Sequence, residues 1–499
     1  MTKQFLNGNG KLAKSNSSLH VTSPKEVQHI GLFNCICIII GIIIGAGIFV
    51  SPVGIIKHVG SVGMSLTMWG IVGVFSVLCA LCYAELGACF PQSGGEYIYV
   101  KKAWGDFCAF MCLWMNMIII FPVCVATAGL IFASYVLKPF YPECEPPQEV
   151  IRLIAASVVA LIVAINSHNV NWVTKLQKFI TVCKVFALVI IIVIGFIWMG
   201  KGNVESFQNS FEDSDYSAGA ITLAFYSGFW AFGGWNYFNC VTGEVINPKR
   251  NLPLGIMISI TVVTVIYVTV NVAYFSVLTP MEMLQSSAVA VTFLERTVVS
   301  LAYVVPFLIA ISVVGGINGA VMLVSRLFVV AAKNNHLPRI ISMRHVETST
   351  PIPSLITMFV LVIIMQSVGD IFCLIEMMGF SLSVVLTMVF AGQVWLRRKM
   401  PLLKRPIIVP VIIPALLCII NGAILFITIY QKYEESCLAL IIIGCGIPAY
   451  LLGPMWKKPK LVQGALDSVT IFLQKLLLVS EHEDNEKAEV IGFQNDITA

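Results

Sequence analysis

The stretch GIIIGAGIFVSP at residues 41–52 decides the fold, and SGFWAFGGW at residues 227–235 repeats its character. Each stretch places a cluster of glycines inside an apolar run long enough to cross a membrane. Backbone in lipid must satisfy its own hydrogen bonds, so such a cluster needs a structural reason. It predicts either close packing of two helices or a helix that is interrupted within the membrane.

The two clusters occupy matching places, because they fall in the first span of each of two sets of five. Glycine-interrupted spans at corresponding positions in two halves are the best sequence indication of a transporter site. An unwound segment exposes N–H groups that hold a carboxylate and carbonyl oxygens that hold an ammonium group. A single cluster would favour helix packing, but the matched pair favours a binding site.

The composition agrees with a protein embedded in lipid. Of 499 residues, 58% are hydrophobic and only 11% are charged, against about 25% charged in an average soluble domain. This excludes a cytosolic enzyme, a nucleic-acid-binding protein and a disordered scaffold. Runs of about 20 apolar residues predict an all-α membrane protein with twelve transmembrane helices, at 31–55, 62–86, 105–136, 150–166, 179–200, 219–244, 253–277, 298–330, 353–369, 371–396, 407–430 and 437–455.

The basic residues predict the orientation. If both termini are cytosolic, 23 of the 31 Lys and Arg residues fall on the cytosolic side, as the positive-inside rule requires. Residues 1–30 are then a cytosolic tail, 31–455 the transporter domain, and 456–499 a cytosolic tail. Apolar residues at three- and four-residue steps predict an amphipathic helix on the membrane surface at 461–479. Residues 1–28 show no signal peptide.

Eight further motifs carry a resemblance that runs over roughly residues 28–480. The chain resembles the light subunits of heteromeric amino-acid transporters, within the amino acid–polyamine–organocation superfamily. It is most similar to the cystine and dibasic amino-acid light chain, and an aromatic-preferring relative is also a candidate. The motifs are GAGIFVSP (45–52), SVGMSLTMWG (61–70), CYAELG (82–87), SGGEY (93–97), AFYSGFWAFGGWN (224–236), NPKRNLP (247–253), SAVAVTF (287–293) and RPIIVP (405–410).

The resemblance implies a five-plus-five inverted repeat, two trailing helices, broken first and sixth helices, and sodium-independent exchange of amino acids across the plasma membrane. It also implies a substrate site on the two glycine clusters. Trp230 matches the aromatic residue that closes over substrate in relatives, which implies a role in gating and coupling. The implied substrate-binding residues are Ile43, Ile44, Gly45, Ala46, Gly47, Trp230, Ala231 and Gly233.

Departures from the family pattern predict the substrate. The dibasic carrier has an acid where this chain has Gly233, and several relatives have Lys or Arg where it has Phe121. Ala46 replaces a family serine, which removes a hydroxyl but leaves the backbone donors. Since no fixed charge meets the substrate side chain, the chain is expected to prefer neutral, large or aromatic amino acids. The alternatives are a broad cystine, cationic and neutral exchanger, or a non-transporting assembly subunit.

Charged residues inside spans are functional candidates. Lys184 matches a family lysine between the first and eighth helices, where sodium-coupled relatives hold a sodium ion, and its ammonium group would explain sodium independence. The alternative is a lysine that reaches the cytosolic surface. Glu85 and Glu244 are expected to pair with basic residues near the inner ends of spans two and six, and Arg326 is a candidate partner. No cofactor or metal is expected, because the histidines are scattered.

Cys144 is the one cysteine clearly in a water-exposed outer loop, KPFYPECEPPQEV. A lone extracellular cysteine indicates an intermolecular disulfide. The resemblance implies that it joins a glycosylated single-span heavy subunit; the alternative is a free thiol. The closest light-chain relative suggests a heavy subunit of apical epithelial membranes. A channel or receptor is disfavoured, since the spans show no repeated polar rings and the outer loops are short.

Overall fold

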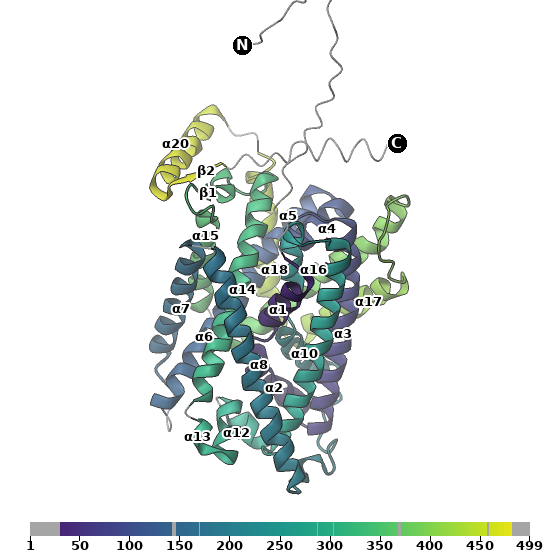
Figure 1. The fold of residues 1–499 in the computed structure, drawn as a ribbon. Helices are drawn as coiled ribbons and strands as arrows, with labels where there is room; N and C mark the ends of the chain where they lie inside the picture. The colour runs from purple at the N-terminus through teal and green to yellow at the C-terminus, as the bar shows by residue number, and fades with distance from the viewer. Residues whose placement is uncertain are drawn as a thin grey trace, which may run out of the picture. The chain divides into compact units, whose positions relative to one another are not determined.

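The computed structural model is helical throughout, apart from two short strands. Figure 1 traces the chain from its first helices to the C-terminal ones. The described residues leave out 1–29 of the predicted tail 1–30, residues 457–458 and 482–499 of the predicted tail 456–499, and the predicted boundary at Gly369 and Asp370. The structure describes residues 30–141, 146–168, 170–286, 288–302, 304–367, 371–456 and 459–481.

Each of the twelve predicted spans corresponds to a helix or to consecutive helical segments. In chain order they are α1 (Leu32–Ile43) with α2 (Gly47–Val59); α3 (Val62–Cys89); α5 (Asp106–Met115), η1 (Asn116–Ile120) and α6 (Phe121–Leu137); α7 (Gln148–His168); α8 (Val170–Gly200); α9 (Ala218–Ala231) with η4 (Asn236–Glu244); α10 (Pro248–Phe275); α14 (Val305–Lys333); α15 (Ile352–Ser367); α16 (Ile371–Lys399); α17 (Ile412–Gln431); and α18 (Tyr433–Gly444) with α19 (Gly446–Leu452).

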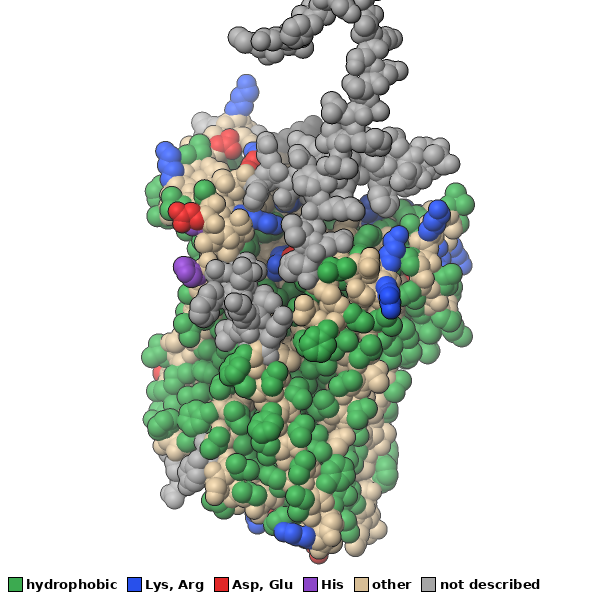
Figure 2. Space-filling view, in the orientation of Figure 1, with side chains coloured by type: hydrophobic (Ala, Val, Ile, Leu, Met, Phe, Trp, Pro, Cys, Tyr) green, Lys and Arg blue, Asp and Glu red, His purple; other side chains and the backbone are tan. Residues whose placement is uncertain are grey.

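Within the described ranges, eight helices are long and apolar enough to cross a membrane, and the pair α1–α2, bent by 47°, makes a ninth. The other three predicted spans are the shorter α9–η4, α15 and α18–α19. Figure 2 shows hydrophobic side chains covering the middle of the visible face, with charged side chains towards its two ends. The predicted class, a multi-span all-α membrane protein, is confirmed.

The connections contain short elements. After α14 the chain forms a strand that pairs antiparallel with a strand following the C-terminal helix, with Arg344 opposite Ser480. This helix, α20 (Lys460–Leu477), is the segment for which the sequence predicts an amphipathic helix. The remaining elements are α4 (Gly95–Trp104), η2 (Lys138–Phe140), η3 (Glu205–Phe207), α11 (Pro280–Gln285), α12 (Val289–Thr297), α13 (Val299–Ala302), η5 (Arg339–Ser342), β1 (Arg344–His345) and β2 (Val479–Ser480).

Both predicted breaks are present. The first helix stops at Ile43 and resumes at Gly47, so three residues lie outside regular helix. The sixth span stops at Ala231, turns over residues 232–235 and continues as the 3₁₀ helix η4. The breaks therefore occupy the first and sixth spans, the positions that the inverted repeat requires.

Gly234 shows why glycine is needed in the second break. Its φ is +110°, a conformation that L side chains rarely adopt. A Cβ at this position would also lie 2.5 Å from Cγ2 of Ile42 in α1. The glycine therefore permits both the turn and the close approach of the first helix to the sixth span.

Candidate substrate site

The two breaks lie against each other. A Cβ placed on Gly47 would lie 2.4 Å from the Cα of Ala231, so α2 contacts the end of α9 through backbone. On another side, a Cβ on Gly45 would lie 3.8 Å from the Cα of Gly316 in α14. The structure thus brings both glycine clusters and the eighth span into one region, which local sequence patterns alone do not determine.

The break in the first helix leaves backbone donors free. In the described part of the chain, the N–H groups of Gly45 and Ala46 have no hydrogen-bond acceptor. They directly precede α2, which starts at Gly47 and whose N-terminal end carries the positive end of the helix dipole. Free N–H groups at a helix N-terminus form an anion site. The segment therefore presents backbone N–H groups whose chemistry is suited to a carboxylate.

The carbonyl groups of the same break are used by protein side chains. Lys184 on α8 donates from Nζ to the carbonyl oxygens of Gly41 and Ile44, each at 2.6 Å. Its side chain is fully buried, so it does not reach the membrane surface as the alternative interpretation supposed. A Cβ on Gly315 of α14 would lie 3.0 Å from this nitrogen. The ammonium group therefore lies between the first break and the eighth span.

Tyr267 on α10 connects the two breaks. Its hydroxyl lies 2.9 Å from the carbonyl oxygen of Ile43 and 3.2 Å from that of Ala231, and its one hydrogen is shared between them. The ring packs against Trp69 and Phe232. Sequence reasoning missed this residue. Its only local signal is a tyrosine in an apolar span, which does not reveal partners 36 and 224 residues away.

The other predicted contacts line the same region. Trp230 is 8% exposed, and its indole N–H has no acceptor among the described residues. Ile43, Ile44, Ala46 and Ala231 are buried as well.

Gly233 is only partly buried, and the single atom that a Cβ there would approach is the carbonyl oxygen of Trp230, at 3.1 Å. The position therefore has more room for a side chain than Gly234. Phe121 is buried, and its ring packs edge-on against Tyr237 at 5.0 Å between centroids. An apolar ring thus occupies the place where the resemblance implies a cation in several members of the family.

A buried amide cluster lies beside this region. Asn318 on α14 donates to Gln177 Oε1 on α8 at 2.9 Å and accepts from Asn166 on α7 at 3.0 Å. The Asn318 side chain thus joins three spans.

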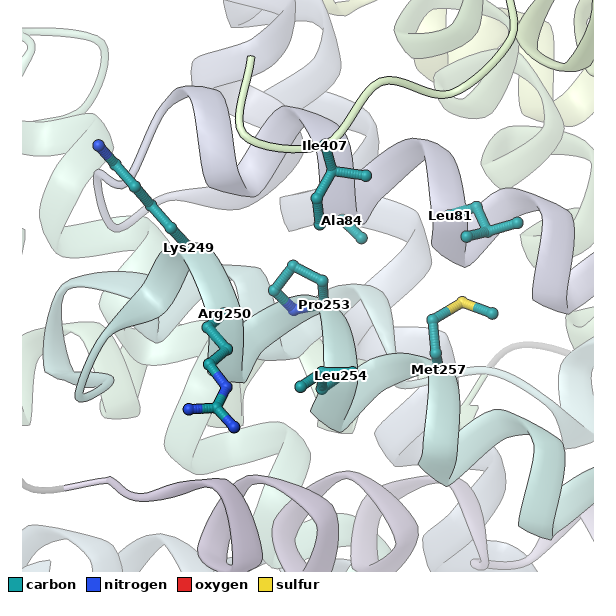
Figure 3. A pocket seen from close by; sticks show the side chains of 8 residues that line it. All are labelled: Leu81, Ala84, Lys249, Arg250, Pro253, Leu254, Met257 and Ile407. Carbon is teal, nitrogen blue, oxygen red and sulfur yellow. The ribbon is translucent and has the colours of Figure 1, made fainter. Parts of the chain in front are cut away.

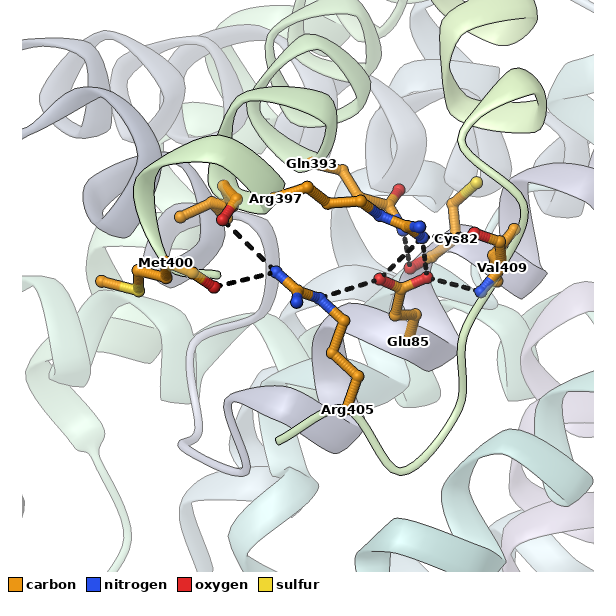
Figure 4. A network of polar contacts seen from close by, with 8 residues as sticks. Cys82, Glu85, Gln393, Arg397, Met400, Arg405 and Val409 are labelled. Atoms are coloured by element: carbon orange, nitrogen blue, oxygen red, sulfur yellow. Dashed lines mark hydrogen bonds and ion pairs between the residues drawn. The ribbon is translucent and has the colours of Figure 1, made fainter. Parts of the chain in front are cut away.

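Two ion-pair networks lie at one end of the spans, as the sequence predicted. Arg326 Nε lies 2.6 Å from Glu244 Oε1, which joins α14 to η4. Glu85 at the end of α3 accepts from Arg397 at 2.7 Å and from the Val409 N–H at 2.8 Å (Figure 4). Arg405 lies 3.5 Å from the other oxygen of Glu85. These contacts tie the CYAELG and RPIIVP motifs together.

A third acidic residue, Glu96 of α4, is buried, and no cation among the described residues bonds to it. Its Oε2 accepts from the Tyr83 hydroxyl at 2.9 Å and from Asn236 Nδ2 at 3.3 Å. Its Oε1 has no partner among the described residues. Burial raises the pKa of this carboxyl group. Because Asn236 begins η4, Glu96 supports the segment that follows the second break.

Other predicted features have mixed outcomes. Cys144 lies outside the described residues, and the fourteen described cysteines form no disulfide with one another. Glu376, for which the sequence suggested no role, lies 3.2 Å from Lys432 Nζ.

Two helices broken where they contact each other in a helical bundle, with free N–H groups and a buried ammonium group at the break, are typical of a membrane transporter of small solutes. The chain belongs to the amino acid permease family, whose model matches residues 30–447. This match covers every predicted span except the end of the twelfth.

Curated relatives agree over almost the whole chain. The human cystine/glutamate transporter is 41% identical over 482 residues, 96% of each chain. The mouse large neutral amino acids transporter small subunit 2 is 39% identical over 467 residues, 93% of this chain and 88% of the relative. The mouse Asc-type amino acid transporter 1 is 38% identical over 456 residues, 91% and 86% respectively. The resemblance to light subunits of heteromeric amino-acid transporters is therefore confirmed.

Proposed function

We propose that this chain is a sodium-independent amino-acid exchanger of the plasma membrane, the light subunit of a heterodimer, and that it prefers neutral, large or aromatic L-amino acids. The observation that carries the proposal is the first break, where free N–H groups of Gly45 and Ala46 lie beside carbonyl oxygens held by Lys184. The proposal also rests on the family and on relatives that are named as transporters rather than enzymes.

The carboxylate and the ammonium group of an amino-acid substrate each have complementary backbone groups at the breaks. The substrate carboxylate binds the N–H groups of residues 45–47, and its ammonium group binds carbonyl oxygens at the C-terminal end of α9, near Trp230 and Ala231. Ile43 and Ile44 complete the segment. Trp230 covers the bound substrate and couples its presence to closure. Its unpartnered indole N–H is available for a polar contact.

Lys184 makes sodium unnecessary. A sodium ion in this position would coordinate backbone carbonyl oxygens of the first break, and the ammonium group already binds two of them. Since the cation is covalently part of the protein, no ion has to bind or leave during the cycle. Transport therefore runs by exchange of one amino acid for another.

The side-chain preference follows from the absence of a charged partner. Gly233 offers space without an acid, and the buried Phe121 ring replaces a cation that would attract an anionic substrate. A charged substrate side chain would remain unpaired in a low-dielectric site, which is costly. Among the relatives, one is named for large neutral amino acids and one for cystine and glutamate, so substrate choice differs within the family.

Assembly and orientation follow the sequence-based interpretation. Cys144 forms a disulfide with a glycosylated single-span heavy subunit, and both termini lie in the cytosol because the basic residues are concentrated on that side. Apical delivery in epithelia would be determined by the heavy subunit.

Counterflow tests the proposal. The full chain, co-expressed with each candidate heavy subunit, is reconstituted into vesicles loaded with a labelled neutral amino acid. Efflux should accelerate when unlabelled neutral amino acid is added outside, equally with and without sodium. Trp230→Ala should abolish this acceleration, while Trp456→Ala, at an exposed tryptophan, should not. Efflux that does not change when unlabelled amino acid is added outside would rule out an exchanger. Acceleration of efflux by lysine or glutamate but not by neutral amino acids would overturn the proposed substrate preference.

A further inference from the structure

A groove outside the proposed substrate site runs between α3, α10 and the segment before α17. It has a volume of about 360 Å³ and is lined by Leu81, Ala84, Lys249, Arg250, Pro253, Leu254, Met257 and Ile407. Figure 3 shows Pro253 and Met257 of α10 facing Ala84, Leu81 and Ile407, with the two basic residues at one end. Six of the eight lining residues are apolar, so the groove suits a hydrocarbon chain with an anionic end.

The helix that lines the groove has an exposed apolar face. On α10, the exposed side chains Leu254, Ile258, Val262 and Val265 follow one another at steps of four, four and three residues and are 39–62% exposed. This spacing places them on one face of the helix. Arg250 lies four residues before Leu254, at the head of the same apolar stripe, and is itself exposed. Arg250 thus places a positive charge at one end of this exposed apolar stripe.

No anion in the described part of the chain neutralises the two basic residues. Within the described ranges, neither Lys249 nor Arg250 forms an ion pair. They also lie in the first turn of α10, which contains no acidic residue and whose N-cap, Asn247, makes no side-chain capping bond. Cations at a helix N-terminus oppose the helix dipole. An external anion would satisfy both the side chains and the helix end.

We propose that this groove binds an anionic phospholipid, with its phosphate group at Lys249 and Arg250 and an acyl chain along Leu254, Met257 and Leu81. The nine residues from Lys249 to Met257 span about 12 Å of helix, enough to hold the upper part of one chain. Anionic lipids are concentrated in the cytosolic leaflet, and the predicted orientation places this end of α10 there. The inference is independent of the exchange proposed above.

Photolabelling tests the site directly. The purified full-length protein is placed in phosphatidylcholine nanodiscs that contain phosphatidylserine with a diazirine in its acyl chain. Labelled peptides should contain residues 81–84 and 249–257. Unlabelled phosphatidylserine should compete, while phosphatidylcholine and inorganic phosphate should not. Labelling displaced equally by phosphatidylcholine would overturn the charge-based proposal, and displacement by inorganic phosphate would show that the site takes the phosphate group alone.

Variants that remove charge test the phosphate-binding end of the groove, and a variant that changes shape tests the part that holds the acyl chain. Each cation near a membrane surface contributes roughly a fivefold effect on binding. The double variant Lys249→Gln, Arg250→Gln should therefore weaken competition by unlabelled phosphatidylserine about 25-fold. Arg398→Gln with Lys404→Gln is the matched control, since both residues are exposed and outside the groove. Leu254→Trp should reduce labelling without a charge change. Wild-type groove peptides without label would refute the proposal.

Discussion

The ammonium nitrogen of Lys184 lies 2.6 Å from the carbonyl oxygen of Ile44, the first residue outside helix α1. It donates equally closely to Gly41, one turn earlier in the same helix. One side chain on α8 therefore satisfies the last carbonyl groups of α1 that the break would leave without donors. The geometry of the anion site beside it depends on this contact.

Replacing Lys184 with methionine should abolish exchange. Methionine has a similar length but no donors, so two buried carbonyl oxygens would lose a partner, each at a cost of about 1–3 kcal/mol. We expect at least a roughly tenfold loss of counterflow with the chain still delivered to the membrane. Lys201→Met is the control, because Lys201 is an exposed residue whose ammonium lies over the Trp198 ring. Full exchange by the Lys184 variant would show that the site does not need the ammonium group.

Tyr267→Phe should weaken substrate binding. The change removes only the hydroxyl that joins the Ile43 and Ala231 carbonyl groups, so the two breaks can move apart. A loss of about 1–2 kcal/mol, or roughly tenfold in half-saturating substrate concentration, is expected from uptake measurements. Tyr274→Phe is a close control on the same helix, since Tyr274 is fully buried and its hydroxyl has no partner among the described residues. Equal effects of the two changes would exclude a specific bridging role.

Gly233→Asp should shift preference towards cationic amino acids. The position is partly exposed and has space for a side chain, so the new carboxylate can pair with a substrate ammonium or guanidinium group. Arginine should inhibit the uptake of labelled leucine more strongly, because the new carboxylate can pair with the arginine side chain. Gly234→Ala provides the contrast: φ of +110° and a contact at 2.5 Å predict loss of folding or transport. Unchanged selectivity at position 233 would refute the proposed side-chain pocket.

Cys144→Ser should remove the covalent link to the heavy subunit. On non-reducing gels of cells that co-express both subunits, the high-mass band should disappear, and noncovalent association should remain partly measurable by co-purification. Cys437→Ser tests specificity, since Cys437 is an exposed cysteine with no disulfide in the described residues. If the high-mass band persists in the Cys144→Ser variant, another cysteine forms the disulfide to the heavy subunit.

The sequence predicts the spans and breaks because these depend on local signals. Apolar runs set the helices, and the glycines at 45, 47, 233 and 234 indicate where they stop. Long-range partners have no such signal. Tyr267 reaches back 224 residues to Ile43, and Asn318 selects Gln177 across 141 residues, so these contacts follow from how the spans pack. Arg326 with Glu244 was predictable because buried charges require partners.

Glu96 should make stability depend on pH. Burial raises the pKa of its carboxyl group above the usual 4.5, while the hydrogen bonds from Tyr83 and Asn236 act in the opposite direction with smaller effect. The folded protein therefore holds this proton more tightly than the unfolded chain does. The resulting stabilisation is complete below pH 4.5 and decreases as pH rises from 4.5 towards the raised pKa.

Glu96→Gln should remove this dependence, because glutamine has the shape of the protonated acid and does not titrate. The midpoint of thermal unfolding of the purified complex, measured between about pH 4.5 and 8, should fall with pH in the wild type more than in the variant. Glu205→Gln, at an exposed carboxylate, should leave the wild-type profile unchanged. Parallel profiles for wild type and Glu96→Gln would mean that the carboxyl group is already ionised in the folded protein. In that case Glu96 would hold η4 as a buried anion, and Glu96→Gln would weaken the contact with Asn236 at every pH.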